Sequence, residues 1–125
     1  MAEALQIELV AADRVVWSGQ ARQVIARTVD GDLGVLVGHA PLLSLLVPGV
    51  VEITDAEGNV VRAAVDEGFL SVADDRVSIL SEDAFLADEI DAEAVRLELA
   101  TAESEGETAA IRRADAKLRA IQKAS

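Results

Sequence analysis

The chain has 125 residues, of which 51% are apolar and only 2% aromatic, so it fits one domain with an aliphatic core and excludes a disordered chain. Its formal net charge of −12 opposes binding to nucleic acid and to anionic lipid. No cysteine is present, which excludes disulfides and thiolate chemistry. The first ten residues contain the acid Glu3 and no basic residue, so they do not match a secretory signal.

Short β-forming runs predict strands at the start of the chain. Residues 6–17 begin with an alternation of apolar and polar side chains, and Ser18-Gly19 is a turn signal. A second β-leaning run follows at residues 21–29, and Asp30-Gly31 is typical of a hairpin turn.

The segment from Leu33 to Val51 contains no formally charged side chain if His39 is neutral. Its length is about that of a membrane-spanning helix. Glycines and prolines interrupt it, and they argue against a continuous helix. The segment therefore predicts two buried strands joined by a turn. The interrupting residues are Gly34, Gly38, Pro41, Pro48 and Gly49.

Two further hairpins are predicted in the middle of the chain. Residues 51–54 and 60–65 flank a loop whose Gly58-Asn59 pair accepts positive φ at low cost. Residues 67–80 repeat the pattern, with Asp74-Asp75 as the turn. Short strands separated by turns every ten residues or so favour an antiparallel sandwich or barrel.

After about Phe85 the composition favours helix, because glycine and proline vanish except at Gly106. Asp91 is placed to cap a first helix and Thr108 a second, which predicts an antiparallel helical hairpin. The predicted apolar faces are Ile90, Ala94, Leu97 and Leu99 in the first helix, and Ile111, Ala114, Leu118 and Ile121 in the second.

Charge divides sharply between the two helices. Residues 88–107 hold eight acids and one base, and residues 108–125 hold five bases and one acid. We favour mutual attraction within the hairpin as the explanation. The alternative is a basic helix that also addresses an acidic partner. The five bases are Arg112, Arg113, Lys117, Arg119 and Lys123.

The residues predict no catalytic or metal site. The glycines of residues 31–38 lack the Gly-Lys-Ser/Thr of a phosphate loop. His39 has no cysteine or second histidine beside it, so a structural or contact role is favoured over catalysis. Trp17 alone is a core or interface anchor rather than a base-stacking platform. The acids Asp66, Glu67, Asp74 and Asp75 lack EF-hand spacing and are interpreted as solvated turns.

Three motifs in order resemble the epsilon subunit family of F-type ATP synthases. They are VVWSG at residues 15–19, GDLGVLVGHAPLL at 31–43 and EGFLSV at 67–72, followed by the two-helix tail. The resemblance implies a β-sandwich of about ten antiparallel strands over residues 1–87 and a C-terminal helical hairpin over residues 88–125.

The resemblance also implies a function. Such a chain is a non-catalytic rotor subunit of the central stalk in a proton-translocating bacterial complex, and it links the gamma subunit to the ring of c subunits. Its helices extend towards the alpha and beta subunits and inhibit ATP hydrolysis. It would be peripheral to the membrane, on the cytoplasmic face of the bacterial plasma membrane.

Site residues follow from the resemblance only. Asp32 and His39 would contact the c-ring. Arg112, Arg113, Lys117 and Arg119 would meet acidic loops of the catalytic head.

Ile90 and Asp91 match the start of the family's nucleotide motif, but Ala94 stands where that motif has arginine. A guanidinium there would supply charge-assisted bonds to the nucleotide. Weak or absent ATP binding is therefore expected, with no other cofactor.

Two other functions remain open from the residues. One is a freestanding adaptor whose hairpin binds a peptide or helix. The other is a small-ligand β-sandwich protein, or an enzyme, with Asp66, His39 or Asp32 in a pocket.

Overall fold

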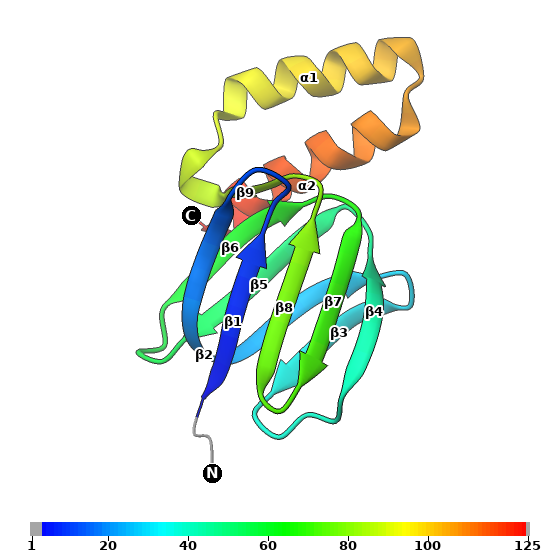
Figure 1. The fold of residues 1–125 in the computed structure, drawn as a ribbon. Coiled ribbons are helices and arrows are strands. Elements are labelled where there is room, and N and C mark those ends of the chain that lie inside the picture. The colour runs from blue at the N-terminus through cyan, green and yellow to red at the C-terminus, as the bar shows by residue number, and fades with distance from the viewer. Residues whose placement is uncertain (1–3, 125) are drawn as a thin grey trace.

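The computed structural model describes the backbone of residues 4–124 and the side chains of residues 4–122, so Glu3 and the side chain of Lys123 lie outside it. Strands fill the first part of the chain and two helices the last (Figure 1). The strands are β1 (Leu5–Val10), β2 (Val15–Thr28), β3 (Gly31–Leu36), β4 (Leu42–Leu46), β5 (Gly49–Asp55), β6 (Val60–Val65), β7 (Gly68–Ala73), β8 (Arg76–Ser81) and β9 (Ala84–Leu86). A 3-10 turn, η1 (Ala87–Glu89), leads into α1 (Ala92–Glu105) and α2 (Thr108–Ala124).

The strands form two layers that share β2. One layer holds β1, β8, β7 and β4, and the other holds β3, β2, β5, β6 and β9 (Figure 1). The first half of β2 pairs with β1 and its second half with β3 and β5. The predicted β-sandwich followed by two helices is confirmed, with nine strands in the described residues and one parallel pairing, between β1 and β8.

The predicted turn at Ser18-Gly19 is wrong, because β2 runs through it without a break. Gly19 pairs with Ile7 of β1. A Cβ atom on Gly19 would lie 3.0 Å from a ring carbon of Trp17, so the glycine makes room for the indole rather than for a turn. The register shift after Ala21 is the irregularity typical of a bulge where β2 passes between layers.

The prediction of two buried strands between Leu33 and Val51 is wrong for their outer faces. Leu36 on β3 and Leu43 on β4 are 58% and 72% exposed. Alternate residues of these strands face the core, as Val35 and Leu46 do, and the others face outwards. None of the helices in residues 4–124 is long and apolar enough to cross a bilayer.

Both predicted central hairpins form. Gly58 closes the β5–β6 loop at a φ of 90°, and the Asp55 carboxylate accepts bonds from the N–H groups of Glu57 and Asn59. Asp74 and Asp75 make the β7–β8 turn with φ of 51° and 60°. Asp and Asn tolerate this left-handed region better than other non-glycine residues.

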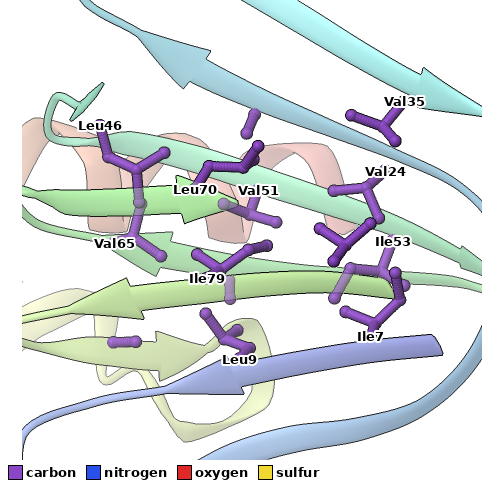
Figure 2. Close-up of a cluster of buried hydrophobic side chains, with 14 of the residues drawn as sticks. Ile7, Leu9, Val24, Val35, Leu46, Val51, Ile53, Val65, Leu70 and Ile79 are labelled. Carbon is purple, nitrogen blue, oxygen red and sulfur yellow. The ribbon is translucent and has the colours of Figure 1, made fainter. Parts of the chain in front are cut away.

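Large aliphatic side chains from both layers fill the space between them (Figure 2). Gly68 at the start of β7 shows how tightly this body is built, because a Cβ atom there would clash with the backbone carbonyl oxygen of Leu80. The side chains with no exposed surface include Leu5, Leu9, Ile53, Leu70 and Ile79.

The helices stack outside the sandwich, with α2 between α1 and the strands β5 and β6 (Figure 1). The predicted Asp91 cap is confirmed, since its carboxylate accepts bonds from the N–H groups of Glu93 and Ala94. The predicted Thr108 cap is wrong. Helix α2 already includes Thr108, and the Glu107 carbonyl accepts the N–H of Ile111.

The predicted apolar face of α1 is also wrong in part. Ala94 and Leu97 are exposed, and the buried residues are Val95 and Ala102. The sequence contains two overlapping stripes at helical spacing, and only the partner helix selects between them. In α2 the predicted Ala114 is buried, but so are Ala116 and Ala120, which face Ala64 of β6.

Candidate functional site: an apolar sheet face and the hairpin interface

The described residues contain no group of three or more metal-ligating side chains. The structure also separates Asp32 from His39. Asp32 lies near the start of β3, in a loose ion pair with Arg27 at 3.9 Å, whereas His39 follows the end of that strand. The His39 ring nitrogen Nδ1 lies 2.7 Å from the carbonyl oxygen of Ala40. The backbone N–H of His39 donates to the Leu36 carbonyl.

The connection between β3 and β4, which contains His39, lies at the pole of the sandwich away from the helices (Figure 1). There the N–H of Gly38 donates to the Asp75 carboxylate at 2.6 Å, which ties the β3–β4 connection to the β7–β8 turn. Gln6 joins the same pole through its N–H to the Asp75 carbonyl. The pole is thus a fixed set of turns rather than a loose loop.

An apolar row crosses the outer face of the layer that contains β4, β7 and β8. Leu45 pairs with Phe69, and Phe69 pairs with Leu80, so the three side chains lie side by side on one face. Each is about half exposed, at 49%, 50% and 49%. We call Leu45, Phe69 and Leu80 the apolar row. Leu43 extends it along β4.

The surface is hollowed beside the apolar row. A groove of about 380 Å³ is lined by Val29, Leu46, Val47 and Phe69, among others. Glu67 and Glu82 also line it. A partner with a protruding apolar side chain and nearby bases would complement such a surface.

The hairpin interface centres on a buried acid, Asp66, which follows β6. Only 8% of the residue is exposed, so the interpretation of Asp66 as part of a solvated turn is wrong. Its carboxylate lies 3.9 Å from the Arg113 guanidinium of α2. One turn further along α2, the Lys117 ammonium lies 3.2 Å from the Glu98 carboxylate of α1 and 4.8 Å from the centre of the Phe85 ring.

The four cations predicted to reach the catalytic head therefore do not share one face in the docked hairpin. Arg113 and Lys117 line a cavity against the sandwich edge. Arg112 and Arg119 line a separate hollow together with Arg27. Arg119 is paired with Asp115 of its own helix at 2.9 Å.

The residues of the partial nucleotide motif have structural roles in this conformation. Asp91 caps α1, and Ile90 packs against Ala64 and Ala120 under α2.

A second ion pair holds the connection between the sandwich and the hairpin. The Arg14 guanidinium donates to both carboxylate oxygens of Glu89 at 2.8 and 2.9 Å, and to the Ala84 carbonyl. The Leu86 N–H also donates to Glu89. The hydrogen bond from Arg14, then that from Leu86, lowers the pKa of Glu89 below its ordinary value.

Sequence reasoning missed Asp66–Arg113 and Arg14–Glu89 as partners. Their members lie far apart in the chain, so no local spacing could have paired them. Only the packing of α2 near the end of β6, and of η1 near the β1–β2 loop, brings them together.

Comparison with known proteins agrees with this architecture. Residues 4–87 match the family model of the ATP synthase delta/epsilon chain β-sandwich domain. The chain is 54% identical over 121 residues to the ATP synthase epsilon chain of Streptomyces avermitilis, which covers 97% of this chain and 98% of that relative. It is 48% identical over 125 residues to the epsilon chain of Rhodococcus jostii, covering 99% and 100%.

Two solved structures share the fold. A chain in the Euglena gracilis mitochondrial ATP synthase (OSCP/F1/c-ring) aligns with a TM-score of 0.78 at 23% identity, covering 99% of this chain and 82% of that one. A chain in the central stalk and c-ring of the Tetrahymena thermophila mitochondrial enzyme aligns at 0.60 and 17%, covering 94% and 96%. The chain therefore belongs to the ATP synthase delta/epsilon chain family, a family of subunits that carry no catalytic centre of their own.

Proposed function

We propose that this chain is a non-catalytic central-stalk subunit of a proton-translocating bacterial ATP synthase. In this role the sandwich links the gamma subunit to the c-ring, and the hairpin inhibits ATP hydrolysis. Membership of the family supports the assignment to the complex. The complex would hold the chain at the cytoplasmic face of the plasma membrane as a peripheral component.

The apolar row is the observation that carries the link to gamma. Three half-exposed large side chains in register on a flat sheet face leave apolar area that water solvates poorly. Burial at about 25 cal/mol per Å² favours a partner that covers them. The rigid core behind the row supports torque transmission, because it resists deformation when the partner rotates.

The pole that contains His39 is the part of the sandwich we assign to the c-ring. The bond from Gly38 to Asp75 fixes the shape of this pole. Asp32 lies at the other end of β3, with a carboxylate side chain that is 69% exposed, so we assign it a separate contact on the ring. Both assignments rest on the family resemblance.

The hairpin is the part we assign to inhibition. Released from the sandwich, it would present Arg112, Arg113, Lys117 and Arg119 to acidic surfaces of the alpha and beta subunits. We propose that ATP does not drive this change, because Ala94 offers no guanidinium and Ile90 is already packed under α2.

The test of the proposed link is co-purification with the synthase. Phe69→Asp places a charge in the centre of the apolar row, and it should strip the chain from the gamma subunit when the complex is purified from solubilised membranes. Leu97→Asp is the control, since Leu97 is also an exposed large apolar residue, at 71%, but lies on α1. Equal retention of both variants would contradict docking through the apolar row. Absence of the wild-type chain from the complex would contradict the function.

A further inference from the structure

The Asp66 carboxylate is positioned by the sandwich alone. The backbone N–H of Asp66 donates to the Ser81 hydroxyl at 2.9 Å, and that hydroxyl donates to the Asp83 carbonyl at 2.7 Å. The N–H of Glu67 donates to Asp66 Oδ1 at 2.8 Å. One carboxylate oxygen is thus held by the backbone, while the other, Oδ2, is the atom that faces Arg113.

Phe85 supplies the second half of the same surface. It lies on β9, two residues after Asp83, and its ring accepts the Lys117 ammonium at 4.8 Å in a cation–π contact. Arg113 and Lys117 are four residues apart, so they project from one side of α2 and reach the acid and the ring together. A cavity of about 100 Å³ remains between these groups, which is enough to hold water.

The remaining contact of α2 with the sandwich is made mainly by small side chains. The buried cluster there consists of Ala64, Ala116 and Ala120, with Val50 and Ile90 partly buried beside it. Alanine methyl groups bury little area, so they contribute little free energy to docking. The contacts of Arg113 with Asp66 and of Lys117 with Phe85 add to this small apolar contact, and they are the charged contacts that α2 makes with this part of the sandwich.

We infer that Asp66 and Phe85 form a receptor on the sandwich for the cations Arg113 and Lys117, and that this receptor competes with the catalytic head for those two cations. The receptor itself is a property of the isolated chain. The competition rests on the proposed function, because it requires that the same cations inhibit hydrolysis. A hairpin held by the sandwich cannot then inhibit, and an inhibiting hairpin leaves Asp66 unpaired.

Substitution of Asp66 and substitution of Arg113 both break the same ion pair, but they should have opposite effects on the inhibition of ATP hydrolysis by the synthase. Asp66→Asn loosens the hairpin and leaves both cations intact, so inhibition of ATP hydrolysis should increase. Arg113→Gln loosens the hairpin equally but removes one of the cations, so inhibition should decrease. A merely structural ion pair would shift both variants in the same direction.

The first experiment measures docking in the isolated full chain. Trp17, the single tryptophan, lines a groove together with Ile121 of α2, so its emission should shift to longer wavelength when α2 leaves. Asp66→Asn and Arg113→Gln should each shift the emission and speed hydrogen exchange of α2 amides by about fivefold, as expected for loss of an ion pair whose arginine is half exposed.

The double variant should differ little from either single variant, because both remove the same interaction. Arg112→Gln on the neighbouring position and Asp74→Asn at the far pole are the charge-matched controls. If the four variants exchanged alike, or the double variant showed the full sum of the single effects, the receptor would be refuted.

The second experiment measures ATP hydrolysis by synthase reassembled with each variant. Stronger inhibition with Asp66→Asn and weaker inhibition with Arg113→Gln is the expected result. Loosened hairpins with unchanged hydrolysis in both variants would leave the receptor in place and overturn the competition together with the proposed inhibitory role. A shift of both variants in one direction would overturn the competition alone.

Discussion

The two regions of the molecule are held together by different means. The sandwich buries large branched side chains such as Leu9, Ile53 and Leu70 with no exposed surface. Among the side chains that the structure describes, its core includes none from α1 or α2. The hairpin meets the sandwich through alanines and a few charged contacts. The fold thus combines a stiff body with an element that can leave it without exposing the large aliphatic core.

The same difference separates the two proposed tasks. Torque transmission needs a body whose packing resists deformation, which dense aliphatic cores provide. Regulation needs an element with two arrangements of similar free energy, and weak apolar contact makes that possible. The clamp between Arg14 and Glu89 lies between the regions, so it would keep η1 on the sandwich while the helices move.

The largest expected effect is on the sandwich core. Leu70→Ala removes most of a fully buried side chain, and such changes lower the free energy of unfolding by about 2–5 kcal/mol. Urea denaturation followed by circular dichroism would measure it. Leu97→Ala, the same substitution at a 71% exposed position on α1, should stay within about 0.5 kcal/mol of the wild type. Equal effects at the two positions would contradict the difference in packing between the sandwich core and the outer face of α1.

An intermediate effect is expected at the hairpin interface. Ala120→Leu inserts a large side chain where Ala120 is fully buried against Ala64, and overpacking of this kind disfavours the docked state by about 1–3 kcal/mol. Hydrogen exchange should show faster exchange in α2 while the amides of β5 and β7 stay protected. Ala100→Leu, at an exposed position of α1, is the control. Joint loss of protection in both regions would show that they unfold as one unit.

The smallest effect concerns the clamp. The pKa of Glu89 is held below its ordinary value chiefly by the hydrogen bond from Arg14. The charged carboxylate therefore stabilises the fold at every pH above the ordinary pKa of a glutamate. That contribution is lost as the pH falls through the lowered pKa. Arg14→Gln should move the pKa of Glu89 back towards its ordinary value in an NMR titration, whereas Arg22→Gln should not. An unmoved Glu89 titration in Arg14→Gln would contradict the clamp.

Local patterns explain why most of the sandwich could be predicted. Turn residues such as Gly58 and the Asp74-Asp75 pair mark hairpins because their backbone conformations are restricted to few residue types. Gly19 was wrongly predicted as a turn residue for the same reason. In the sequence, a glycine that makes room for a neighbouring ring cannot be distinguished from a glycine in a turn.

The hairpin interface was less predictable because its contacts depend on tertiary approach. Val95 and Ala94 are equally plausible on the buried face of α1 until α2 is placed. Aspartate is a residue type common in turns, and only the packing of α2 against the sandwich brings Arg113 to the Asp66 carboxylate. Residue types alone carry no information on such long-range pairs.

The most direct test of the whole account is a chain that ends after Ala87, assembled into the synthase in place of the full chain. Within residues 4–122 the sandwich core contains no residue beyond Leu86, so this body should fold, bind the gamma subunit and support ATP synthesis. ATP hydrolysis by the assembled complex should rise, because the inhibitory helices are gone. Unchanged hydrolysis in a correctly assembled complex would contradict the claim that the hairpin regulates the motor.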